Sequence, residues 1–125
     1  AFEPGRGLVA DCMSLLTRIK LVCSDGDDIF LNDGIYGGLM AFMQVPELQP
    51  PYRVIRDGKV VEGPVKPWKV FGPTCDALDV ISMAENLPEL QRDDLVYSEM
   101  IGAYTYASAT TFNGFSPAKV IHVNQ

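Results

Sequence analysis

The sequence predicts a mainly β domain, either a sandwich or a barrel. Seven or more short segments have the composition of strands, and turns rich in Gly, Pro and Asp separate them. The 125 residues can enclose one ordinary hydrophobic core, and 47% hydrophobic with 21% charged residues is the composition of a folded globular protein. No repeat, low-complexity stretch or linker divides the chain, so we expect one main domain.

The first strand is predicted over residues 15–23, LLTRIKLVC. Leu15, Ile19 and Leu21 share one face, and basic residues occupy the other, which is the alternation of a half-buried strand. Thr17 interrupts the apolar face.

A turn at residues 24–27 leads to a second strand over 28–31, which breaks at 32–34. Residues 36–43 favour a short helix, although each of its two glycines weakens it by about 1 kcal/mol.

The second half of the chain continues the β pattern. A hairpin is predicted over residues 52–61 around an Asp-Gly turn, and a strand over 68–71 follows the proline-rich stretch 64–67. Later strands are expected over 79–83, 94–99 and 119–123, with a loop at 87–90.

Charge and cysteine content exclude several classes of function. A net charge of −6 argues against nucleic acid and anionic membranes, which attract basic surfaces. Cys12, Cys23 and Cys75 have no C-x-x-C spacing, and with the single His122 they make no standard zinc site, so reduced thiols in the cytoplasm are expected. No apolar run approaches the ~20 residues of a membrane-spanning helix, and no targeting leader is recognised.

Three segments carry side chains that could bind a phosphate group or pack against an aromatic ring. Residues 3–6, EPGR, hold a carboxylate and a guanidinium at a fixed spacing, and arginine binds phosphate bidentately. Residues 102–105 add the Tyr104 hydroxyl, and residues 111–115 add Phe112 as an apolar wall. Taken singly, each is a weak signal, and a surface ion pair in a turn, core aromatics and an Asn-Gly turn are the structural alternatives.

Two further segments place acidic groups at turns. Residues 72–76, GPTCD, put Cys75 beside Asp76, and a thiol can donate a proton while a carboxylate holds a cation. Residues 32–38, NDGIYGG, put Asp33 at the end of a strand. A buried thiol beside a capping aspartate, and a capped turn, are the structural alternatives.

In this order, the five motifs EPGR, NDGIYG, GPTCD, GAY and TFNGF resemble the C-terminal part of the pyridoxal-phosphate-dependent ornithine decarboxylase family. That family decarboxylates basic amino acids and shares its fold with alanine racemase. The resemblance covers nearly the whole chain. It implies a C-terminal β-sandwich or Greek-key barrel domain over residues 9–125, preceded at 1–8 by the last strand of an α/β barrel that lies outside this sequence.

The resemblance also implies roles for residues around the cofactor. Glu3 is expected to face the pyridine nitrogen of pyridoxal 5'-phosphate, and Arg6 and Tyr104 to hold its phosphate. A carboxylate beside the ring nitrogen keeps the ring cationic, so that it accepts electrons from the breaking bond.

On the substrate side, the resemblance implies that Cys75 protonates the carbanion left by carbon dioxide. Asp33 and Asp76 are expected to bind the distal amine of the substrate, and Phe112 to form a wall of the pocket. In this family Cys75, Asp76 and Phe112 would reach the active site of the partner subunit, so a head-to-tail homodimer with shared sites is implied.

The two carboxylates favour a cationic amino acid substrate, because burying an ammonium group without a partner is costly. We expect ornithine first, lysine second and arginine third. The family's cofactor lysine, ring-stacking histidine and glycine-rich phosphate loop belong to the barrel and are not found here. The chain alone is therefore expected to be inactive and to bind no pyridoxal phosphate.

Two other hypotheses remain open. The chain could be a catalytically silent relative, a binding protein that regulates polyamine synthesis by competing for a partner. It could also be a free-standing β domain with an unrelated binding role. A complete set of cofactor and substrate residues argues against the silent relative, since a decoy has no physical need for it.

Overall fold

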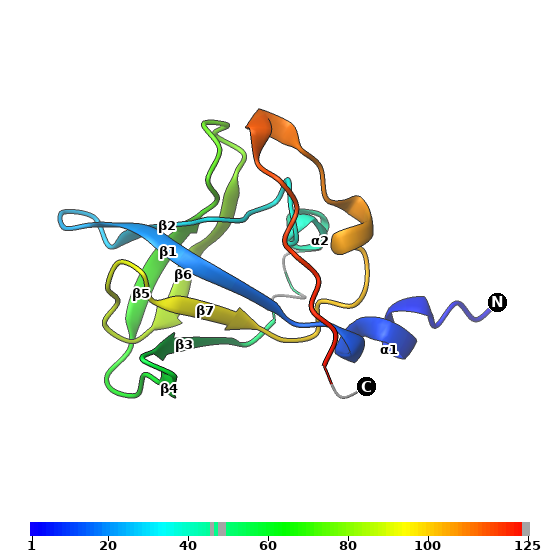
Figure 1. The fold of residues 1–125 in the computed structure, drawn as a ribbon, viewed down its shortest axis with the longest axis horizontal. Helices are drawn as coiled ribbons and strands as arrows, with labels where there is room; N and C mark the ends of the chain where they lie inside the picture. The colour runs from blue at the N-terminus through cyan, green and yellow to red at the C-terminus, as the bar shows by residue number, and fades with distance from the viewer. Residues whose placement is uncertain (46, 48–49, 124–125) are drawn as a thin grey trace.

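The computed structural model describes residues 1–45, 47 and 50–123. In this part of the chain, seven strands form one curled sheet in the order β4-β3-β7-β1-β2-β5-β6 (Figure 1). The predicted mainly β fold is confirmed. The strands are β1 (Leu15–Cys23), β2 (Asp28–Leu31), β3 (Tyr52–Arg56), β4 (Lys59–Val60), β5 (Lys66–Phe71), β6 (Val80–Leu87) and β7 (Leu95–Ser98). Short helices flank them: α1 (Gly5–Val9), η1 (Ala10–Cys12), α2 (Met40–Gln44), η3 (Tyr106–Ser108) and η4 (Phe112–Gly114).

Strand β1 joins the two halves of the sheet. Its residues 15–18 pair with β7, and its residues 19–23 pair with β2, both antiparallel. The register shifts between Ile19 and Leu21, which moves the following side chains to the other face. Leu21 is consequently exposed, whereas Thr17 is buried and donates a hydrogen bond to a β7 carbonyl at 3.2 Å. The predicted alternation therefore holds only up to the shift.

One apolar core contains side chains from both halves of the sheet and from α2. Burying each large aliphatic or aromatic side chain contributes about 1.5–3 kcal/mol. The indole N–H of Trp68, the largest member, donates to the carbonyls of Leu87 and Pro88 at 3.3 and 3.1 Å. The core consists of Leu15, Ile19, Ile29, Leu31, Leu39, Phe42, Val54, Trp68, Val70, Ile81, Leu87, Leu90, Val96 and Ile101.

Three expectations about local structure need correction. The predicted strand over residues 119–123 is wrong: this segment has no regular structure and is exposed, and none of the seven strands in the described part of the chain pairs with it. The helix expected over 36–43 is a turn followed by α2. Residues 1–8 contain the start of α1 rather than a strand, and their place in a neighbouring barrel stays a prediction.

Candidate active site

Two loops that carry predicted substrate-binding residues leave the sheet side by side. Strands β2 and β5 are parallel neighbours, with Phe30 opposite Phe71 and their rings stacked at 5.1 Å. Parallel strands end at the same edge of a sheet. The loop 32–38 after β2 and the loop 72–79 after β5 therefore meet there, although some 40 residues separate them in the sequence.

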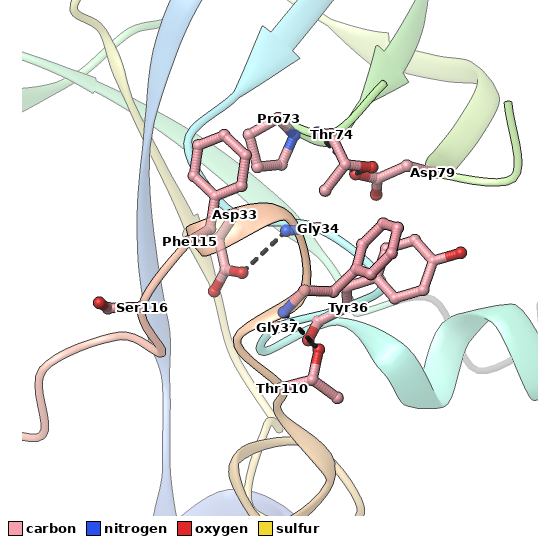
Figure 2. A pocket seen from close by; sticks show the side chains of 11 residues that line it. Asp33, Gly34, Tyr36, Gly37, Pro73, Thr74, Asp79, Thr110, Phe115 and Ser116 are labelled. Carbon is pink, nitrogen blue, oxygen red and sulfur yellow. Dashed lines mark hydrogen bonds between the residues drawn. The ribbon is translucent and has the colours of Figure 1, made fainter. Parts of the chain in front are cut away.

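The carboxylate of Asp33 accepts hydrogen bonds from backbone N–H groups of its own loop. Oδ1 accepts the N–H of Gly34 at 2.9 Å (Figure 2). Oδ2 accepts the N–H of Gly38 at 3.1 Å. A Cβ at Gly37 would overlap this carboxylate, so any other residue there would have to displace it. Burial raises the pKa of Asp33 above its ordinary value and nearby Asp79 adds to the rise, while the two N–H groups lower it. The site therefore favours a cation beside Asp33.

Asp79 connects the two loops. Its side chain is buried, and Oδ1 accepts the N–H of Ile35 at 3.2 Å. Oδ2 accepts the N–H of Thr74 at 3.0 Å and the Thr74 hydroxyl at 2.6 Å. Gly34 and Gly72 pack against this carboxylate so closely that a Cβ on either would overlap it. Asp79 thus holds the Cys75–Asp76 turn against the Asp33 loop.

Tyr36 contacts Asp76 through its hydroxyl, which donates to Oδ2 at 2.5 Å. The other carboxylate oxygen accepts the N–H of Leu78 at 2.9 Å. These two bonds lower the pKa of Asp76, the Tyr36 bond most, and the same bond raises the pKa of Tyr36. Asp76 therefore carries a negative charge at neutral pH. The Tyr36 ring also packs on Phe112, with ring centroids 4.4 Å apart.

Cys75 is exposed and accepts one hydrogen bond. The side-chain amide of Asn113 donates to its Sγ at 3.2 Å. Asn113 lies in η4 with φ of 57°, a left-handed conformation that asparagine tolerates better than most residues. The segment after η3 thus reaches back to the Cys75 turn and brings Phe112 with it.

A small pocket opens between these loops. Figure 2 shows Pro73, Thr74 and Asp79 on one side and Asp33 on the other, while the Tyr36 hydroxyl points away from Asp33. Of the predicted residues, Asp33 and Phe112 line this pocket, and Cys75 and Asp76 lie on the adjoining loop 72–79. The full lining is Asp33, Gly34, Tyr36, Gly37, Pro73, Thr74, Asp79, Thr110, Phe112, Phe115 and Ser116.

The predicted cofactor residues Arg6 and Tyr104 lie in a second region, where the chain after β7 comes back to α1 and η1. The N–H of Gly102 donates to the Ala10 carbonyl at 2.8 Å, and that of Ile101 donates to the Met13 carbonyl at 2.9 Å. A Cβ at Gly102 would overlap the Val9 carbonyl, so glycine permits this close approach.

This return places Tyr104 beside the EPGR motif. The Arg6 guanidinium lies 5.1 Å from the centre of the Tyr104 ring, which is a cation–π distance. Gly5 also lies next to the Tyr104 hydroxyl: a Cβ there would be 3.8 Å from its oxygen, an ordinary contact distance. Glu3 is exposed. Within residues 1–45, 47 and 50–123, no hydrogen bond or ion pair joins Arg6, Tyr104 or Glu3 to the Asp33 loop.

Three residues of the site had escaped the sequence analysis: Asp79, Asn113 and the Tyr36 hydroxyl. Each makes a hydrogen bond to a residue between 38 and 44 positions away in the chain. A local sequence pattern does not predict such a bond. Among the described residues, no group of three His, Cys, Asp or Glu side chains could hold a metal ion. In the same part of the chain, the helices lack the length and hydropathy needed to cross a membrane.

Comparison with known proteins relates this arrangement to characterised enzymes. Residues 8–102 match the family described as "Pyridoxal-dependent decarboxylase, C-terminal sheet domain". The chain is 34% identical to an ornithine decarboxylase of Schizosaccharomyces pombe, over 98% of the chain and 31% of that protein. It is 33% identical to antizyme inhibitor 2 of Xenopus laevis, over 94% of the chain and 28% of that protein.

A solved structure shows the same fold. The lysine/ornithine decarboxylase of Vibrio vulnificus, in complex with cadaverine, superposes with a TM-score of 0.82 and 32% sequence identity. The alignment covers 96% of this chain and 32% of that one. The chain thus spans about a third of the length of the relatives it matches. It belongs to the pyridoxal-dependent decarboxylases, and residues 8–102 are the C-terminal sheet domain of that family.

Proposed function

We propose that this chain is the C-terminal part of a pyridoxal-phosphate-dependent decarboxylase of basic amino acids, with ornithine as first substrate and lysine as second. The enzyme would act in polyamine biosynthesis in the cytoplasm. The observation that supports this most strongly is that Asp33 lines the pocket while Asp76 and Cys75 lie on the adjoining loop, where Asp76 is bound to the pocket residue Tyr36 and Cys75 to Asn113.

The two carboxylates suit the terminal ammonium group of such a substrate. Burial raises the pKa of Asp33, so an ammonium group beside it would restore a favourable environment for its charge. Asp76 keeps its charge through the Tyr36 and Leu78 bonds. A substrate with a neutral side chain would leave these two carboxylates without a positively charged partner.

The second group of residues fits the phosphate and ring of the cofactor. The Arg6 guanidinium and the Tyr104 hydroxyl are two donors within one small region. They would hold the phosphate, while the exposed Glu3 carboxylate would keep the ring nitrogen protonated. When bound, the cofactor supplies the electron sink for the bond to the departing carboxyl group.

Cys75 would supply the proton that replaces the lost carboxyl group at the substrate carbon. Asn113 positions Sγ for this transfer by its hydrogen bond. Cys75 and Phe112 are exposed on this chain rather than enclosed by it, which suits residues that complete the pocket of a second subunit. We therefore also propose a homodimer with two shared sites.

A second function has a specific observation in its favour. Antizyme inhibitor 2 is a relative with 33% identity, and its name describes an inhibitor of antizyme. A regulatory protein would need neither the Cys75 thiol nor the Arg6–Tyr104 group. The presence of Glu3 together with these three residues favours the enzyme.

Reading the coding DNA upstream of Ala1 and expressing the complete reading frame tests the proposal. The protein is expected to bind pyridoxal phosphate and to release carbon dioxide from ornithine or lysine. Cofactor binding without release from any basic amino acid would favour the regulatory protein. The 125-residue chain alone is expected to bind no cofactor at micromolar concentration.

A further inference from the structure

The Asn113-Gly114 dipeptide is a sequence feature whose own chemistry the proposed function does not use. It lies in η4, and both residues are exposed. An asparagine followed by glycine is open to deamidation, because glycine has no Cβ to shield its backbone nitrogen from the asparagine side chain. Asn113 can therefore undergo a chemical change that needs only water.

Few contacts restrain this dipeptide. A Cβ at Gly114 would have no heavy atom within 4 Å, so the space beside it is empty. The N–H of Gly114 donates to the Thr111 carbonyl at 3.0 Å, and the Asn113 amide donates to Cys75 Sγ at 3.2 Å. Thr111 and Cys75 are themselves exposed. Both bonds can therefore open locally, without unfolding of the core.

The other two asparagines of the described residues are held more firmly. Oδ1 of Asn32 accepts the N–H of Arg18 at 2.7 Å, and the Asn32 N–H donates to the Arg18 carbonyl at 3.0 Å. Asn86 lies in the paired strand β6 and is followed by the branched side chain of Leu87. Neither asparagine precedes a glycine. Deamidation is therefore expected to be fastest at Asn113.

We propose that Asn113 deamidates spontaneously and that this change removes the hydrogen bond that holds the Cys75 thiol. The Gly114 nitrogen attacks Cγ of Asn113. As the new N–Cγ bond forms, the Cγ–Nδ2 bond breaks, and Nδ2 leaves as ammonia with the proton from Gly114. Water then opens the cyclic imide at either carbonyl carbon, which gives aspartate or isoaspartate. No oxidant, reductant or cofactor takes part.

Both products change the contact with Cys75. The amide that donates to Sγ at 3.2 Å becomes a carboxylate, which cannot donate and carries a negative charge. Isoaspartate also adds one carbon atom to the backbone, which would shift Phe112 relative to Tyr36, whose ring centroid lies 4.4 Å away. The proposed proton donor would thus lose its position as the protein ages. This consequence, unlike the deamidation itself, rests on the proposed function.

Mass spectrometry of tryptic peptides tests the reaction in the 125-residue chain. The chain is incubated at mildly alkaline pH, and the conversion of each asparagine to aspartate or isoaspartate is followed over time. Asn113 is expected to convert at least about tenfold faster than Asn32 and Asn86, since those two react only when a more stable part of the fold opens. Equal or slower conversion at Asn113 would overturn the proposal.

Gly114→Ala tests the attacking group, because it adds one methyl group beside the nitrogen of residue 114. Gly58→Ala is the matched control: Gly58 and Gly114 have φ of 73° and 79°, and a Cβ at either meets no atom within 4 Å. Conversion of Asn113 should slow at least about tenfold in Gly114→Ala, the effect of a small added barrier, and stay unchanged in Gly58→Ala. An unchanged rate in Gly114→Ala would overturn the mechanism.

Asn113→Asp tests the effect on Cys75 directly, because it places the carboxylate beside Sγ. Iodoacetamide alkylates thiolates, and a negative charge about 3.2 Å away disfavours the thiolate. Labelling of Cys75 is expected to slow by about three- to tenfold, while labelling of the exposed Cys12 in the same sample stays unchanged. Equal labelling of Cys75 in the variant and the wild type would overturn the loss of the contact.

In the full-length protein, Asn113→Asp is expected to slow carbon dioxide release from ornithine or lysine by about three- to tenfold, the effect of one lost hydrogen bond, with cofactor absorbance retained. Unchanged turnover would overturn the consequence for activity. If the wild-type protein releases no carbon dioxide from either substrate, the proposed function itself fails, whereas the mass change at Asn113 is measured independently of it.

Discussion

Replacing Gly72 by alanine is expected to destabilise this chain, and removing the Asp79 carboxylate is expected to abolish most of that cost. All three atoms nearest to a Cβ at Gly72 belong to the Asp79 carboxylate, and the Cβ would overlap them. Gly72 is buried and does not have a positive φ, so alanine suits its backbone. The penalty is therefore steric and has one identifiable cause.

The magnitudes follow from the bonds that Asp79 makes. Asp79→Ala loses three hydrogen bonds to Ile35 and Thr74, at about 1 kcal/mol each, or about 3 kcal/mol in all. Gly72→Ala must displace the same carboxylate and should cost about 2–3 kcal/mol. In the double variant the added methyl group enters vacated space. Gly72→Ala should then cost under about 1 kcal/mol, which is a coupling energy of about 2 kcal/mol.

Urea unfolding of the four proteins, followed by Trp68 fluorescence, measures this coupling, because the buried Trp68 becomes exposed on unfolding. Gly34→Ala is the control: its Cβ would overlap Asp79 but would also lie 2.8 Å from the Gly72 backbone. Asp79→Ala should therefore not rescue it. Additive costs for Gly72 and Asp79, within about 0.5 kcal/mol, would refute the reasoning.

Three further predictions concern charge and the proton donor. Because burial raises the pKa of Asp33 in the folded chain, its contribution to stability is present below the ordinary aspartate pKa and is lost as pH rises through the higher folded value. Asp33→Asn should lack this fall in unfolding free energy, which urea titrations at several pH values would show. Arg56→Met leaves the buried Asp94 carboxylate without two 2.7 Å hydrogen bonds and should lower the free energy of unfolding by about 3 kcal/mol. In the same assay Arg53→Met, which breaks the more exposed pair with Glu99, should lower it by under about 1 kcal/mol. In the full-length protein, Cys75→Ala should slow product formation at least tenfold while cofactor absorbance is retained, and unchanged turnover would remove Cys75 as proton donor.

Much of the fold could be predicted from local pattern. The bounds of β1 and β2 coincide with the predicted segments 15–23 and 28–31, because apolar alternation and a turn of small polar residues determine them locally. The segment 119–123 is also rich in β-branched residues but forms no strand. A strand also needs a neighbour with free backbone groups, and a single sequence does not show which strands pair.

The site could be predicted only in part for the same reason. Cys75 and Asp33 are reactive or charged groups at predicted turns, and only the resemblance to a family assigns them to active sites of one enzyme. The parallel pairing of β2 and β5, which brings the two loops together, has no local signal in the sequence. Asp79 was assigned to the start of a strand because its role depends on the loop 32–38, far from it in the chain.

Substrate selection in the complete protein tests the central claim most directly. The claim is that Asp33 and Asp76 together bind a terminal ammonium group. Carbon dioxide release should be measured from ornithine, from lysine and from norvaline, which has the carbon skeleton of ornithine without its terminal amine. Release from ornithine or lysine should exceed that from norvaline at least about a hundredfold in kcat/KM, because norvaline would bring an apolar group to carboxylates that need a cation in the closed site. Equal release from norvaline would contradict the claim.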